Sequence, residues 1–84
     1  MGIKLNDKKT LIRDEEGLKL LATKLKEIRA KKKYTQESLA YESGITLSQI
    51  ARIETCKINP TVSTMFKIAR TLKINVSELF DFTL

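Results

Sequence analysis

The sequence predicts an all-α fold, a compact bundle of five short helices. Its 84 residues suit a single domain. Apolar residues recur at three- and four-residue steps along most of the chain, which is the period of a helix face. Residues that favour helix starts precede the successive apolar segments: Asp14, Thr35, Thr46, Thr61 and Asn75.

The first expected helix lies between about residues 14 and 32. Acidic residues at 14–16 suit the positive end of the helix dipole, and lysines at 31–33 suit the negative end. One apolar face follows from residues at helical spacing: Leu18, Leu21, Leu25 and Ile28.

The chain before this face has a different character. Residues 1–13 are polar without a strong period, and they fit either a flexible arm or a short strand. We therefore place an N-terminal arm or helix extension at residues 1–17 and the helical domain at residues 18–84.

The second expected helix covers residues 36–43. Thr35 can cap its start, and Leu39 and Ala40 face inward. Gly44 can adopt the left-handed conformation that ends many helices and that side chains resist.

The third expected helix covers residues 47–55. Thr46 can cap it, with Gln49 completing a capping box, while Ile45 and Ile50 occupy the positions of a hydrophobic staple. Two short helices joined by such a turn form a helix-turn-helix, whose second helix can enter the DNA major groove.

The fourth expected helix covers residues 62–73, after Pro60 and a capping Thr61. Its expected inner face consists of Val62, Met65, Phe66, Ala69 and Leu72. Asn75 with Glu78 predicts another capping box, which begins a short fifth helix carrying Val76, Leu79 and Phe80.

The composition limits the classes of function that this chain can have. The formal charge is +6, and all of it lies in residues 1–33, where eleven basic and five acidic residues stand; residues 34–84 hold five of each. A basic excess fits either a polyanionic partner or a solvated lysine face. Without histidine, and with Cys56 alone, we expect no metal, no cofactor and no enzyme activity. No apolar run is long enough for a membrane span, so we expect a cytoplasmic protein with no membrane partner.

The third helix has two distinct faces. At about 100° per residue, Ile50, Ile53 and Glu54 fall on one side and Ser48, Arg52 and Thr55 on the other. The apolar side must pack on the bundle, and the polar side is free to meet a groove.

Four residues are candidates for base contact: Leu47, Ser48, Gln49 and Arg52. Arg52 has the chemistry to bind guanine O6 and N7, and Gln49 either binds adenine or serves the helix cap. Ser48 can bond a base or a phosphate, and Leu47 can touch a thymine methyl group or pack.

Gln36 is a candidate phosphate contact. It occupies the first position of its helix, where backbone N–H groups favour anions. Further candidates flank the third helix or precede the second: Thr46, Thr55, Lys57 and Lys33.

At these residues the sequence resembles the Cro and CI-type (XRE family) helix-turn-helix repressors. The resemblance spans roughly residues 22–80. It rests on Thr35-Gln36, Leu39-Ala40, Gly44-Ile45, Ile50, Ile53-Glu54, Pro60, Ile68-Ala69, Leu72 and Leu79-Phe80.

The resemblance implies a five-helix bundle that binds palindromic operators as a dimer. It implies a phosphate contact for Gln36, base contacts at 47–49 and 52, and a structural ion pair between Arg29 and Glu54. Two positions depart from the pattern. Leu47 stands where several members carry a base-reading glutamine, and Cys56 stands where the family usually has glycine.

The leading hypothesis is a dimeric, sequence-specific transcriptional regulator of double-stranded DNA, with half-sites about 34 Å apart. The apolar C-terminal end offers a dimer contact, or alternatively closes the core, through Leu79, Phe80, Phe82 and Leu84. The second hypothesis is a protein-interaction module, such as a toxin-binding antitoxin or an adaptor.

Overall fold

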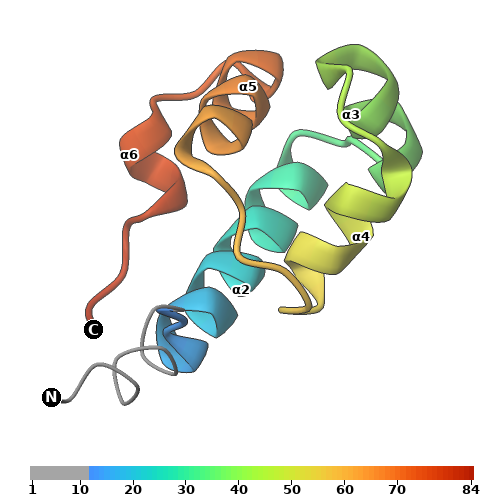
Figure 1. The fold of residues 1–84 in the computed structure, drawn as a ribbon. Helices are drawn as coiled ribbons and strands as arrows, with labels where there is room; N and C mark the ends of the chain where they lie inside the picture. The colour runs from blue at the N-terminus through green and yellow to red at the C-terminus, as the bar shows by residue number, and fades with distance from the viewer. Residues whose placement is uncertain (1–11) are drawn as a thin grey trace, which may run out of the picture.

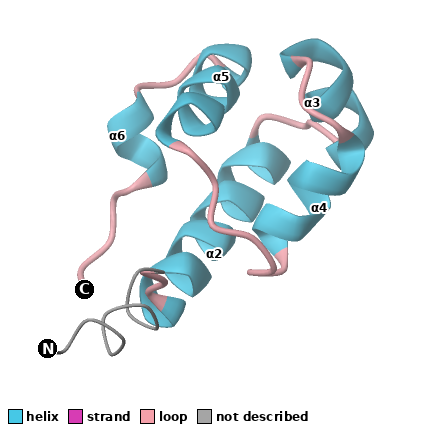
Figure 2. Cartoon of the chain, in the orientation of Figure 1, coloured by secondary structure: helices cyan, strands magenta, loops and turns pink. Residues whose placement is uncertain are grey.

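The computed structural model describes residues 12–84, and this part of the chain is all-helical without any strand (Figures 1 and 2). The five predicted helices are confirmed. They are α2 (Glu15–Lys31), α3 (Gln36–Ser43), α4 (Leu47–Glu54), α5 (Val62–Leu72) and α6 (Val76–Leu79). The predictions for residues 1–11 concern a segment outside the described residues.

The helix ends agree with the predicted ends to within about one residue. Helix α2 begins at Glu15, because the Asp14 carboxylate accepts a hydrogen bond from the Gly17 N–H at 2.9 Å. The helix therefore starts three residues before position 18, where we placed the start of the domain.

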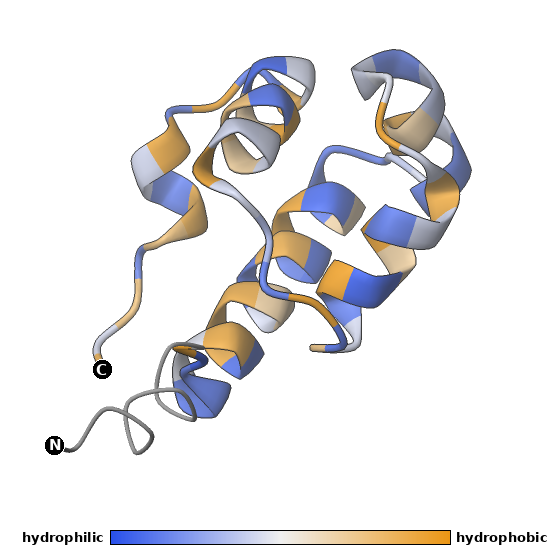
Figure 3. Cartoon of the chain, in the orientation of Figure 1, coloured by the Kyte–Doolittle hydropathy of each residue, from blue (hydrophilic) through white to orange (hydrophobic). Residues whose placement is uncertain are grey.

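Helix α2 is the longest and lies at the centre of the bundle (Figure 1). Helices α4 and α6 pack against it, α3 packs against α4 and α5, and α5 packs against α6. Each helix contributes to one core, whose largest fully buried side chains are Leu25, Leu39, Ile50, Ile68, Leu72 and Leu79. The hydropathy colouring shows orange residues on the sides of α2, α4 and α5 that face the bundle (Figure 3). Burying each such side chain contributes about 1.5–3 kcal/mol.

The predicted inner face of α5 was partly wrong. Val62 and Phe66 are largely exposed, whereas the buried residues are Met65, Ile68, Ala69 and Leu72. These four follow one face at steps of three and four. Phe66 lies one position off that face, and Val62 belongs to the first turn, at the edge of the bundle.

The helix caps follow the predictions closely. The hydroxyls of Thr35, Thr46 and Thr61 each accept a hydrogen bond from the N–H three residues later, at 2.9, 3.1 and 3.2 Å. The Glu78 carboxylate accepts from the Asn75 N–H at 3.2 Å. The predicted capping box of α4 is only half formed. The Gln49 N–H donates to the Thr46 hydroxyl, but within the described chain the Gln49 side chain accepts no bond from the Thr46 N–H. The Gln49 amide is therefore free of the cap.

Four helices are followed, one or two residues after their last residue, by a residue with positive φ: Lys33, Gly44, Cys56 and Lys73. Only Gly44, at φ 77°, was expected. After α4, the Cys56 N–H donates to the Ile53 carbonyl and the Lys57 N–H to the Arg52 carbonyl, which is the Schellman pattern. Cys56 thus adopts the conformation that a glycine would adopt without strain.

Candidate nucleic-acid interface

The exposed face of α4 is the candidate interface. Ile50, Ile53 and Glu54 are buried, as the helical period predicted. The four base-contact candidates, Leu47, Ser48, Gln49 and Arg52, are all exposed on this helix. At about 100° per residue, Ser48 and Arg52 lie in the middle of this exposed face, and Leu47 and Gln49 lie at its two borders.

The turn between α3 and α4 is held by a buried serine. The Ser43 hydroxyl accepts from the Ile45 N–H at 3.2 Å, while Ile45 and Ile50 are both buried in the core. Gly44 closes α3 with a bond from its N–H to the Ala40 carbonyl at 3.0 Å. This arrangement fixes how α4 projects from the bundle, although the sequence pattern gave no reason to single out Ser43.

A charged network lies behind α4. Glu54 is 4% exposed, and Arg29 binds its carboxylate through two hydrogen bonds, Nε to Oε2 at 2.6 Å and Nη2 to Oε1 at 3.0 Å. Arg29 Nη1 donates to the Tyr34 carbonyl at 2.9 Å. The hydrogen bond to Glu54 raises the pKa of Arg29, against an opposing effect of burial. The network therefore joins α2, the start of α3 and the end of α4.

Gln36 belongs to this network, which sequence reasoning missed. Its Nε2 donates to Glu54 Oε1 at 2.9 Å, and the residue is half-buried. The predicted phosphate contact is thus tied to the predicted structural ion pair. Spacing alone gives no signal of this, because residues 36 and 54 meet only once α3 and α4 have packed.

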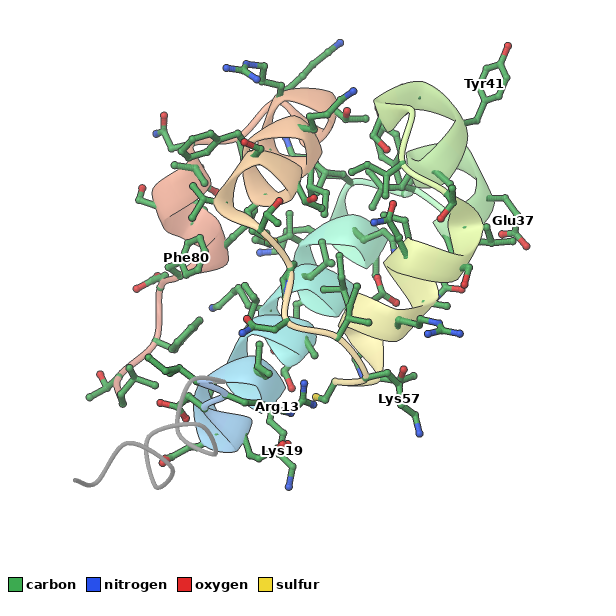
Figure 4. All side chains as sticks on the ribbon, in the orientation of Figure 1. Arg13, Lys19, Glu37, Tyr41, Lys57 and Phe80 are labelled. Carbon is green, nitrogen blue, oxygen red and sulfur yellow. The ribbon has the colours of Figure 1, made fainter. Side chains whose placement is uncertain are left out.

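Of the other phosphate candidates, Thr46, Thr55 and Lys57 flank α4, and Lys33 lies between α2 and α3. Lys57 and Lys33 are exposed, and Lys57 projects into solvent from the loop after α4 (Figure 4). The Thr46 hydroxyl accepts the capping bond but keeps its proton available. The Thr55 hydroxyl donates to the Ala51 carbonyl at 2.9 Å, so its proton is used within α4.

The loop after α4 is attached to the segment before α2. The Arg13 guanidinium donates to the Cys56 carbonyl, and the Asn59 amide donates to the Ile12 carbonyl at 3.1 Å. Figure 4 shows Arg13 beside the start of α2. These contacts hold the loop that carries Lys57, and no local sequence pattern predicts them.

The C-terminal candidates divide between core and surface. Leu79 is 0% exposed and closes the core, and Phe82 is half-buried. Phe80 and Leu84 are 46% and 73% exposed. Together with Phe82 they line a mostly apolar groove of about 340 Å³, whose other walls include Leu18, Leu21, Pro60, Val62 and Met65.

Neither a metal site nor a membrane helix emerges from residues 12–84. No group of three or more histidine, cysteine or carboxylate residues is placed there to hold a metal ion. None of the helices in this range has the length and apolar character needed to cross a membrane.

Comparison with known proteins gives consistent matches to one class. The model of the helix-turn-helix family HTH_3 matches residues 25–79. An uncharacterized HTH-type transcriptional regulator of Archaeoglobus fulgidus is 37% identical over 62 residues, covering 74% of this chain and 87% of the relative. The regulator PuuR of Escherichia coli is 37% identical over 67 residues, covering 80% of this chain and 36% of PuuR. The crystal structure of the restriction-modification controller protein C.AhdI from Aeromonas hydrophila superposes with a TM-score of 0.73 at 33% identity, covering 75% of this chain and 96% of that protein.

Proposed function

Because the chain belongs to the helix-turn-helix family HTH_3, and is therefore a DNA-binding transcriptional regulator and not an enzyme, we propose that α4 reads base sequence in the major groove. One observation carries the proposal. Ser48, Gln49 and Arg52 lie exposed on one helix whose opposite face is anchored in the core. Arg52 would bind a guanine, Gln49 an adenine, and Leu47 a thymine methyl group.

The surroundings of α4 suit the DNA backbone. Lys33 and Lys57 are exposed cations, and Gln36 stands at the N-terminus of α3. Helix N-termini and cations are the groups that bind phosphate oxygens. In this proposal the Thr46 hydroxyl donates the proton that its cap leaves available, and the Thr55 hydroxyl exchanges its bond to the Ala51 carbonyl for one to a phosphate oxygen.

We further propose that two copies bind a palindromic operator in the cytoplasm. The apolar groove at the C-terminal end, with Phe80, Phe82 and Leu84, would form the symmetric contact. Leu79 supports this surface from the core and does not itself cross the contact.

Arg52→Ala tests the proposal, with Arg70→Ala as a matched control. Both arginines are exposed, but Arg70 lies in the last turn of α5. A preferred sequence is first selected from a library of random duplexes. Arg52→Ala should lose about 5- to 150-fold in affinity for that site and relax the preference at one base pair, since a bidentate contact discriminates by about 1–3 kcal/mol. Arg70→Ala should keep the same base preference. Binding of duplex DNA with no sequence preference would contradict the proposal.

One observation favours a second candidate, a surface for a protein partner. Tyr41 on α3 is 88% exposed and points away from the bundle, with Glu37 exposed one turn earlier (Figure 4). A carboxylate repels the DNA backbone, and an exposed tyrosine is typical of protein interfaces. If this surface binds a protein, Tyr41→Ala should leave DNA affinity unchanged and weaken regulation in cells. Normal regulation by this variant would exclude the second candidate.

A further inference from the structure

The side-chain amide of Gln36 makes one hydrogen bond and uses only part of its bonding capacity. Its Nε2 donates to Glu54 Oε1 at 2.9 Å, and only the nitrogen side of an amide can donate to a carboxylate. Among the described residues, the second Nε2 hydrogen and the amide oxygen have no hydrogen-bond partner. The bond to Glu54 therefore holds the Gln36 amide group in place, while the second hydrogen on Nε2 remains available to a ligand.

That donor belongs to the first residue of α3. The Thr35 hydroxyl accepts the Ser38 N–H, but the backbone N–H groups of Gln36 and Glu37 have no partner in the described chain. Unpaired N–H groups at a helix start attract anions. The free amide hydrogen and these N–H groups are thus the donors that a phosphate at this helix end would meet.

Glu54 is itself held by its neighbours. It is buried, and Arg29 occupies both of its oxygens while also binding the Tyr34 carbonyl just before α3. Arg29 offsets the charge of the carboxylate, so Glu54 can hold Gln36 without strongly repelling a phosphate nearby. A glutamine side chain is flexible in solution and must be ordered before it contributes to binding.

We propose that Glu54 is a positioning residue for DNA binding. It orders the Gln36 amide before DNA arrives, so that the contact between Gln36 and the phosphate backbone depends on the ion pair between Arg29 and Glu54. This inference rests on the proposed DNA-binding function and adds a role for a residue that touches no DNA.

The test compares the effect of Gln36→Ala in two backgrounds. The first is the wild-type chain, and the second carries Arg29→Met with Glu54→Leu, which removes both charges together and avoids a stranded one. Affinity for a duplex of arbitrary sequence is measured where every variant is folded, because phosphate contacts do not depend on sequence. In the wild type, Gln36→Ala should weaken binding by about fivefold, the effect of about one hydrogen bond. In the second background it should have almost no effect. Equal losses in both backgrounds would overturn the positioning role.

A measurement on the wild-type chain keeps the inference testable if the double variant does not fold. In NMR spectra of the free protein, the Gln36 side-chain amide protons should exchange with solvent more slowly than those of the exposed Gln49, because one of them is bonded to Glu54. Adding the duplex should shift the signal of the proton not bonded to Glu54 more than the other. Exchange as fast as that of the Gln49 side-chain amide in the free protein would overturn the inference. A wild-type chain that binds no duplex at all would instead overturn the proposed function.

Discussion

Arg29 and Glu54 form a bidentate ion pair across the bundle, from the last turn of α2 to the last residue of α4. Arg29→Ala would leave the buried carboxylate uncompensated. We expect it to lower the free energy of unfolding by about 3–5 kcal/mol. Urea denaturation followed by circular dichroism measures this. The double change Arg29→Met with Glu54→Leu should cost much less, and a loss as large as that of Arg29→Ala would contradict this account.

Lys57 should contribute to DNA affinity without contributing to sequence preference. Lys57→Ala removes an exposed cation beside α4, so affinity should fall to a similar extent on every sequence. The slope of log affinity against log salt should decrease by about one. Lys73→Gly is the control, because it removes the same charge from a different part of the bundle. Lys73 lies between α5 and α6, and α6 packs on α2 and α5. A slope that Lys57→Ala leaves unchanged would exclude a phosphate contact there.

Cys56 carries backbone strain that glycine would relieve. Its φ is 61°, a region that costs non-glycine residues roughly 1–2 kcal/mol. Cys56→Gly should therefore raise the midpoint of thermal unfolding, although the added flexibility of the unfolded chain offsets part of the gain. Calorimetry with and without a thiol reductant separates this effect from cysteine oxidation. A lower midpoint in both conditions would show that the thiol contributes more than the strain costs.

Gly44→Ala should have the opposite effect. The φ of Gly44 is 77°, and the nearest atom to an added Cβ would be Lys67 Nζ at 3.5 Å, an ordinary contact. The expected loss of about 1 kcal/mol or more therefore comes from backbone strain alone. Gly17→Ala is the matched control, because Gly17 lies in α2 at ordinary φ and alanine favours helices. That variant should be as stable as the wild type or more so.

Tyr34 should make stability depend on pH at the alkaline end. Its hydroxyl donates to Glu42 Oε1 at 2.9 Å, and this bond raises the pKa of Tyr34 above its usual value of about 10. Since the folded-state pKa is the higher one, the contribution is complete below about pH 10 and is lost as the pH rises through the folded value. Absorbance at the tyrosinate band in a Tyr41→Phe background measures the titration. Glu42→Gln in that background should lower the midpoint, and no change would exclude Glu42 as the cause.

Phe80 and Leu84 should control self-association. Replacing both with serine removes exposed apolar area from the C-terminal groove while leaving Leu79 in the core. If the groove is the dimer contact, sedimentation should show a weaker dimer at unchanged helix content. Tyr41→Ser, which also removes an exposed aromatic side chain, should leave association unchanged. Equal dimer affinity in the doubly substituted chain would place the contact elsewhere.

The fold was largely predictable because its determinants are local. The capping threonines, Gly44 and the apolar spacing act within a few residues of one another, and they placed the ends of α3, α4 and α5 to within about one residue. The division of α4 into buried and exposed faces also follows from the helical period.

The site was predictable only as a set of exposed side chains. The bond from Gln36 to Glu54 and the bond from Arg13 to the Cys56 carbonyl join residues that are far apart in sequence. Such pairs depend on how helices pack, and no local pattern encodes them. The exposure of Phe66 was missed for a similar reason. The spacing of α5 allows two neighbouring inner faces, one that includes Phe66 and one that includes Ile68, and only the packing of the helices decides which of them meets the core.

The non-glycine residues at the ends of α2, α4 and α5 have a consequence for how this protein can change. Lys33, Cys56 and Lys73 each hold a conformation that glycine adopts more easily, and Lys73 lies between α5 and α6, outside the segment that carries α4. Stability can therefore be gained at such a position without altering Ser48, Gln49 or Arg52. Substitutions that give a regulator a new target sequence often lower stability, and this chain has places where that loss can be compensated. Its binding preference and its thermal tolerance are thus open to separate adjustment, in evolution and in the design of regulators with new targets.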